Sequence, residues 1–204
     1  MTRKLADDVA RRRDAALAGH RGDVAAARAF LSDPAPAVRA TALAALARVG
    51  SLTGDDLAAG LADDAVAVRA RAAELCAGWP GDRPPPLAPV LSAPDADPEV
   101  VEVAAWASGE RRPPEPGVVP ALAAVATTHD DPLCREAAVA ALGAIGDPAG
   151  LAAILAATTD RPAVRRRAVL ALAPFAGPEV DAALDRALSD RDWQVRQAAE
   201  DIGR

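Results

Sequence analysis

Apolar and polar positions alternate with a helical period along residues 33–50. The apolar positions that share one helical face are Val38, Ala42, Ala45, Leu46 and Val49. Asp33-Pro34 precedes this stretch and Gly50 follows it, which is typical of the start and the end of a helix. The pattern therefore predicts a turn, an amphipathic helix and a stop.

The same pattern recurs along the chain, marked by an apolar residue that an arginine usually follows. The marking residues are Val38, Val68, Val100, Cys134, Val164 and Val195, which lie 30, 32, 34, 30 and 31 residues apart. A degenerate earlier copy is placed at Val9, with Leu17 matching Leu46. Such a period fits two short antiparallel helices and their turns, a unit that buries its apolar face only when it is stacked.

The sequence thus predicts a single domain over residues 1–204, with a degenerate cap at 1–20 and helix pairs after it. The pairs are assigned to 22–50, 53–79, 84–110, 117–146, 147–176 and 177–204. The first helices are expected at 23–31, 54–61, 85–91, 118–126, 148–157 and 178–188. The second helices are expected at 36–49, 66–77, 98–108, 132–145, 162–175 and 192–202.

The repeat is irregular at its centre, from residue 80 to 117. Prolines at 84–86 and at 113, 114 and 116 break helices, because proline lacks an N–H and disfavours helix at the residue before it. We expect a change of curvature or a mild hinge in this segment.

The Asp-Pro, Val-Arg and Val-Gly pairs of residues 33–50 resemble the HEAT repeat, as does the stretch from Asp190 through Val195-Arg196 to Ile202-Gly203. The sequence is most similar to the short, phycobilisome-lyase type of HEAT-like repeat, over nearly its whole length. This resemblance implies an all-α fold, an α-solenoid of about six stacked helical hairpins. It also implies that the second helices line a concave groove.

The resemblance further implies a ladder of Asp–Arg hydrogen bonds between neighbouring repeats. Its aspartates would be Asp33, Asp63, Asp95, Asp130 or Asp131, Asp160 and Asp190, and its arginines Arg39, Arg69, Arg135, Arg165 and Arg196. The third repeat departs from the pattern, since Val101 stands where arginine belongs. The arginines also fit a phosphate-binding stripe, but each has an aspartate in its own repeat, which favours the structural role.

Composition narrows the classes of function. Hydrophobic residues make up 51% of the chain and aromatic residues 2%, so alanine-rich helices pack closely and few large side chains remain for a deep ligand pocket. A net charge of −6 argues against nucleic-acid binding, which needs a basic surface. We find no signal peptide and no membrane span in the sequence, and expect a soluble, cytoplasmic protein. The 22 arginines and single lysine suggest a GC-rich bacterial genome.

No catalytic constellation is found. Cys76 and Cys134 lie at core positions of their helices and lack metal-binding spacing. His129 with Asp130-Asp131 is read as helix capping rather than a metal site. HExxH, GxSxG, Walker and GxGxxG motifs do not occur. Nor is there a His-Glu pair of the kind known as a metal ligand in HEAT-type deoxyhypusine hydroxylases.

The face of the second helices opposite the core is expected to bind a partner. Small residues dominate this face, except for Glu74, Glu102, Glu136, Trp106, Leu170 and Arg166. Arg166 and Arg167 form a basic spot next to Arg165. A tryptophan among carboxylates suits a basic partner segment, although a solvated helix face also carries such residues.

The sequence therefore predicts a non-enzymatic scaffold that binds a protein or peptide segment, with no cofactor, metal, nucleic acid or membrane and without a small-molecule ligand. The alternative is an enzyme or enzyme subunit, either a chromophore lyase or a DNA glycosylase built of HEAT-like repeats. A third is a structural module that associates through the array ends or the convex face.

Overall fold

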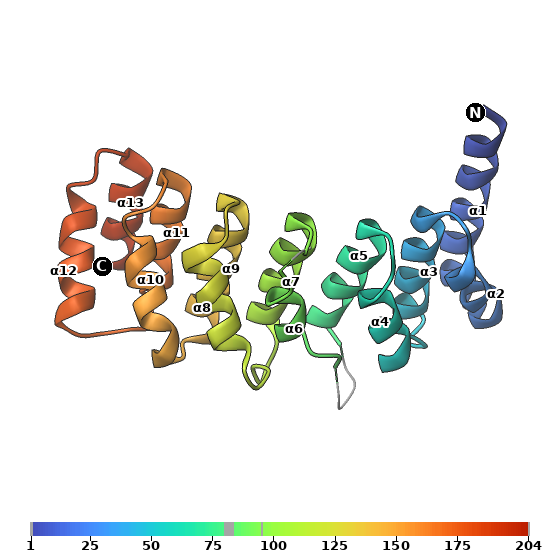
Figure 1. The fold of residues 1–204 in the computed structure, drawn as a ribbon, viewed down its shortest axis with the longest axis horizontal. Coiled ribbons are helices and arrows are strands. Elements are labelled where there is room, and N and C mark those ends of the chain that lie inside the picture. Colours follow the sequence, from blue (N-terminus) through green and yellow to red (C-terminus); the bar gives the residue numbers. More distant parts are fainter. Residues whose placement is uncertain (1, 80–83, 95, 204) are drawn as a thin grey trace. The chain divides into compact units, whose positions relative to one another are not determined.

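The computed structural model describes residues 2–79, 84–94 and 96–203. Every regular element in these residues is helical, which confirms the predicted all-α fold (Figure 1). The chain forms two compact units, residues 1–85 and 86–204. The division falls inside the segment 80–117, where the repeat pattern is irregular. Each unit is a stack of helical hairpins, the architecture of an α-solenoid.

The first unit begins with one long helix, α1 (Thr2–Arg21), and continues with two hairpins. In the first hairpin, α2 (Val24–Ala29) and a 3₁₀ turn, η1 (Phe30–Ser32), precede α3 (Pro36–Arg48). The second hairpin consists of α4 (Gly54–Leu61) and α5 (Val66–Ala77). Helix α3 packs between α1 and α5, so the second helices form a continuous layer.

The second unit contains four hairpins in two layers (Figure 1). The first helices are α6 (Ala88–Leu91), α8 (Val118–Thr128), α10 (Leu151–Ala157) after the 3₁₀ turn η2 (Pro148–Gly150), and α12 (Pro178–Leu188). The second helices are α7 (Pro98–Glu110), α9 (Pro132–Ile145), α11 (Pro162–Ala171) and α13 (Trp193–Ile202). Helices α7, α9, α11 and α13 pack in that order, each on the next.

Helices α6 and α11 are among those that are shorter than the sequence predicts, and both have prolines next to the missing residues. Helix α6 begins at Ala88 instead of residue 85, and Pro86 disfavours helix at residue 85. Helix α11 ends at Ala171 instead of residue 175, ahead of Pro174, which has no N–H to donate to the preceding turn.

Arginine and aspartate side chains tie neighbouring repeats together within each unit. In four rungs, Nε and Nη2 of an arginine donate to the two carboxylate oxygens of the aspartate in the next repeat. These rungs are Arg11–Asp33, Arg39–Asp63, Arg135–Asp160 and Arg165–Asp190, with distances from 2.6 to 3.3 Å. Arg69 and Arg196 donate to the backbone carbonyls of Asp63 and Asp190 in their own repeats. Asp95 lies outside the described residues.

The first repeat has a different register from the one expected. Val9 is 61% exposed and does not belong to the core, whereas Ala15, Ala18 and Gly19 are buried against the rest of the unit. Arg11 makes the rung to Asp33, so the pair equivalent to Val38-Arg39 is Ala10-Arg11, one residue later than predicted. The register was missed because this repeat has alanine, not valine, at the position used to align the repeats.

The fourth repeat also differs from the prediction. Asp131 caps α9 by accepting from the N–H of Leu133, and neither Asp130 nor Asp131 pairs with an arginine among the described residues. His129 holds the position of the ladder aspartate, and its Nδ1 accepts from the Asp131 N–H as the Asp33 carboxylate does from Ala35. The arginine that would pair with an aspartate at position 129 is missing as well, since Val101 stands at its position in the third repeat. Because arginine and aspartate are both replaced, neither charge is left unpaired.

The loop after α7 is fixed by polar contacts within the second unit. Buried Arg111 pairs with Glu115 at 2.8 Å, and the Glu115 carboxylate accepts from the N–H groups of Leu87 and Ala88 at the start of α6. Arg112 donates to the Ala144 carbonyl at 3.1 Å, near the end of α9. The second half of the irregular centre is therefore anchored to two helices. Residues 80–83, in its first half, lie outside the described residues.

Candidate functional site

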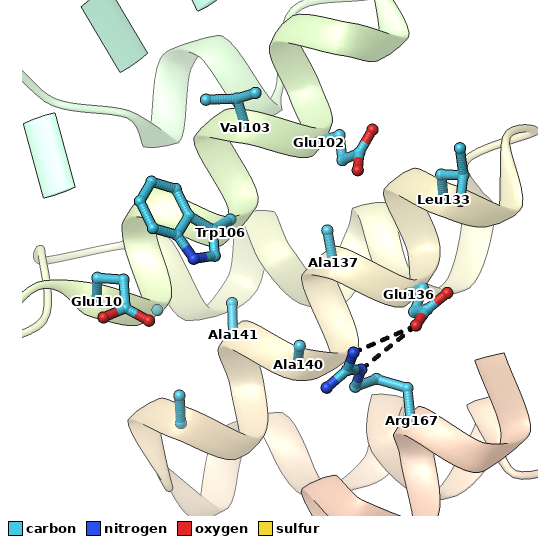
Figure 2. Close-up of a pocket in the computed structure, with 12 residues that line it drawn as sticks. Glu102, Val103, Trp106, Glu110, Leu133, Glu136, Ala137, Ala140, Ala141 and Arg167 are labelled. Carbon is cyan, nitrogen blue, oxygen red and sulfur yellow. Dashed lines mark hydrogen bonds and ion pairs between the residues drawn. The ribbon is translucent and has the colours of Figure 1, made fainter. Parts of the chain in front are cut away.

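A groove runs over the second helices of the second unit (Figure 2). It contains a pocket of about 620 Å³ whose lining comes from α7 and α9, with one residue, Arg167, from α11. Small and apolar side chains form its floor, and charged groups stand at its rim. We call this the Trp106 pocket.

Helical periodicity explains which side chains reach the pocket. On α7, Glu102, Val103, Trp106 and Glu110 follow one another at one, three and four residues, so they share one face. The opposite face of α7 carries the buried residues Val100 and Ala104. Helix α9 presents Leu133, Glu136, Ala137, Ala140, Ala141 and Ala144 at the same kind of spacing.

The floor is formed of alanine and glycine because the second helices approach closely. A Cβ atom on Gly109 of α7 would lie 2.8 Å from the Cα of Ala141 on α9, closer than any side chain tolerates. Trp106 stands above this floor of small residues and is 47% exposed. Gly109 is buried at this contact between α7 and α9, and it also forms part of the pocket lining.

The rim of the Trp106 pocket is acidic. Glu102 and Glu110 make no ion pair among the residues that the structure describes. Glu136 contacts Arg167, whose Nε and Nη2 both lie 3.4 Å from the Glu136 Oε1 atom (Figure 2). Three carboxylates and one guanidinium leave an excess of two negative charges around the exposed tryptophan.

A second, smaller pocket of about 450 Å³ lies between α9 and α11. Leu170 and Pro174 line it, together with small residues. Ala140, Ala144 and Arg167 line both pockets, so the two are parts of one groove. Arg167 lies at their common boundary.

The structure brings together four of the six residues predicted to bind a partner. Glu102, Trp106 and Glu136 line the Trp106 pocket, and Leu170 lines the smaller pocket. Arg166 is exposed and lines neither, whereas its neighbour Arg167 lines both. Glu74 belongs to α5 in the first unit, where it pairs with Arg71 at 2.6 Å.

Glu110 and Leu133 line the Trp106 pocket but were not predicted. The prediction took the groove to be directly opposite the side that faces the first helices. Each second helix also packs against the second helices of its neighbours, and these contacts rotate the open face toward the positions of Val103, Glu110 and Arg167. Glycine at the positions of Gly109 and Gly143 is the sequence signal that marks this helix–helix contact.

The residues described contain no cluster of three or more histidine, cysteine or acidic side chains able to hold a metal ion. The Cys134 thiol is buried, and its Sγ lies 3.2 Å from the Pro98 carbonyl oxygen. Burial, followed by the charges of Asp131 and Glu102, raises the thiol pKa to about 11, so this cysteine remains protonated at neutral pH. No described helix has the length and apolar character needed to cross a membrane.

The stacked hairpins define the class of the chain, an α-solenoid. Residues 84–173 match a family model described as HEAT repeats, which confirms the predicted resemblance to the HEAT repeat for this part of the chain. The prediction of the narrower, phycobilisome-lyase type of repeat stays a prediction. A comparison with curated proteins finds no match.

A comparison with solved structures finds matches at low sequence identity. One is human deoxyhypusine hydroxylase in complex with glycerol, at 23% identity over 94% of this chain and 77% of that chain, with a TM-score of 0.48. A designed armadillo repeat protein has 16% identity over 94% and 88% of the two chains and a TM-score of 0.48. An engineered protein has 20% identity over 94% and 85% and a TM-score of 0.41. None of these similarities bears on function.

Proposed function

We propose that this protein is a non-enzymatic scaffold that holds a basic segment of a partner protein in the groove. The observation that carries the proposal is the Trp106 pocket, where a half-exposed tryptophan stands among the carboxylates of Glu102, Glu110 and Glu136. Exposed tryptophans are frequent anchors at interfaces, and the face of the indole ring attracts cations.

The shape of the groove supports a chain segment over a small molecule. The two pockets join across α7, α9 and α11, and their floor of alanine and glycine leaves room for a polypeptide backbone. The unpaired carboxylates of Glu102 and Glu110 are desolvated at little cost only if the partner brings cations. A basic segment therefore matches both the apolar floor and the acidic rim.

The proposal is tested with a fluorescein-labelled peptide of nine arginines, with binding followed by fluorescence anisotropy. Glu102→Lys and Trp106→Ala are each expected to weaken binding by about tenfold, the loss of roughly 1.4 kcal/mol that is typical of an anchor residue. The matched control is Asp185→Lys, which makes the same change of charge at an exposed position on α12, outside both pockets.

Equal weakening by Glu102→Lys and Asp185→Lys, with no effect of Trp106→Ala, would refute the groove assignment. The enzymatic alternative makes a different prediction for the purified protein. A bound chromophore, a stoichiometric metal ion or activity on alkylated DNA would support a lyase or a glycosylase instead of a scaffold.

A further inference from the structure

In the second unit, arginines of the second helices contact carboxylates of neighbouring repeats in two ways. In the rungs Arg135–Asp160 and Arg165–Asp190, two guanidinium nitrogens donate to two different oxygens at 2.6 to 2.9 Å. In the pair Arg167–Glu136, both nitrogens lie 3.4 Å from the same oxygen. Two parallel bonds are stronger than a single long contact, so Arg167 is held much more weakly than the ladder arginines.

Exposure distinguishes the two kinds of pair as well. The side chains of Arg165 and Asp190 are 7% and 15% exposed, whereas those of Arg167 and Glu136 are 40% and 24% exposed. Exposed pairs of this kind contribute little, because water screens and replaces them. Arg167 can therefore leave Glu136 for solvent at a small cost, which a ladder arginine cannot do.

The position of Arg167 shows which groups become accessible when its guanidinium leaves Glu136. It is the guanidinium that lines the groove, and it lies between the Trp106 pocket and the smaller pocket (Figure 2). While it stays on Glu136, it neutralises one of the three pocket carboxylates and separates the two pockets. The second oxygen of Glu136, Oε2, makes no hydrogen bond among the described residues.

We infer that Arg167 is an internal competitor, which occupies Glu136 until the guanidinium of a partner arginine replaces it. This inference rests on the proposed function, since it concerns the same groove. An incoming guanidinium can bond to both oxygens of Glu136, and the exposed Arg167 returns to water. The partner residue that fits is arginine, because the ammonium of lysine forms no bidentate pair.

The test compares Arg167→Gln with Arg166→Gln, using the nine-arginine peptide and the full chain. Both variants remove one positive charge from neighbouring positions of α11, but Arg166 lines neither pocket. Arg167→Gln is expected to tighten binding by about 1.5- to 5-fold, the range given by an exposed ion pair, whereas Arg166→Gln should change it less. The gain should disappear in a Glu136→Gln background, because Arg167 then has nothing to block.

The inference is overturned if Arg167→Gln and Arg166→Gln have the same effect, if Arg167→Gln weakens binding, or if its gain persists without Glu136. A nine-lysine peptide that binds as tightly as the nine-arginine peptide would overturn the assignment of arginine. These failures differ from failure of the proposed function, in which Trp106→Ala has no effect and Glu102→Lys weakens peptide binding no more than Asp185→Lys does.

Discussion

Replacing Arg165 by Met removes the most buried complete rung of the ladder. Its guanidinium donates to both oxygens of Asp190 at 2.9 and 2.8 Å and to the Asp160 carbonyl at 2.8 Å. The two side chains are 7% and 15% exposed, so water replaces these bonds only in part. Exposed pairs are worth about 0.2–1 kcal/mol and breaking buried ones costs about 3–5 kcal/mol. We therefore expect Arg165→Met to lower the free energy of unfolding by about 2–3 kcal/mol.

A double-mutant cycle with Asp190→Asn isolates the interaction, since each single variant also disturbs other contacts. We expect a coupling energy of about 1–2 kcal/mol, measured by urea unfolding followed by far-ultraviolet circular dichroism. The matched control is Arg71–Glu74 on α5, an ion pair of 2.6 Å whose side chains are 40% and 46% exposed. Its coupling should stay below about 0.5 kcal/mol. Equal coupling in the two cycles would refute the view that burial makes the ladder stabilising.

Three further predictions concern packing, the missing rung and acid stability. Gly143→Ala should lower the free energy of unfolding by about 1–3 kcal/mol, measured with urea, because the new Cβ would lie 2.7 Å from the Cα of Ala171. The control Gly78→Ala should be neutral, because a Cβ there has no atom within 4 Å. Equal costs would contradict the close approach of α9 and α11. Val101→Arg should destabilise the protein by about 1–3 kcal/mol, and adding His129→Asp should recover at least 1 kcal/mol; a double variant no more stable than the single one would disprove the equivalence of these positions. The bond from Arg39 lowers the pKa of Asp63 to about 2. The stability that Asp63 contributes is therefore complete above its ordinary pKa and is lost as the pH falls from about 4 to 2. In Arg39→Met, acid unfolding should not show this loss of stability between about pH 4 and 2.

Most of the fold follows from local patterns in the sequence. Helix α5 has the predicted bounds, Val66–Ala77, and α9 the bounds Pro132–Ile145. In both, apolar periodicity is followed by a glycine stop, and α9 also has a proline at its start. The first repeat was harder to align. Alanine at position 10 carries no distinctive signal, and only the bond from Arg11 to Asp33 reveals its register.

The candidate site was predicted less completely, for a reason of geometry. Glu102, Trp106 and Glu136 were found because they lie far from the core face under any helical periodicity. The sequence pattern predicted Arg166 in the groove and Arg167 beside it, whereas the structure has Arg167 in the groove. Adjacent residues on a helix point about 100° apart, so a small rotation of the open face exchanges their roles. Glu110 was missed for the same reason.

The sequence by itself determined the repeat, the helices and their ends, and the pairing of most Asp and Arg residues, because these depend on short-range periodicity and on a spacing that recurs. The tertiary structure decided which side of each second helix stays open. That depends on the distance between neighbouring helices, set where Gly109 meets Ala141 and Gly143 meets Ala171. This contact exposes Trp106, directs Arg167 onto Glu136 and creates the pocket between them.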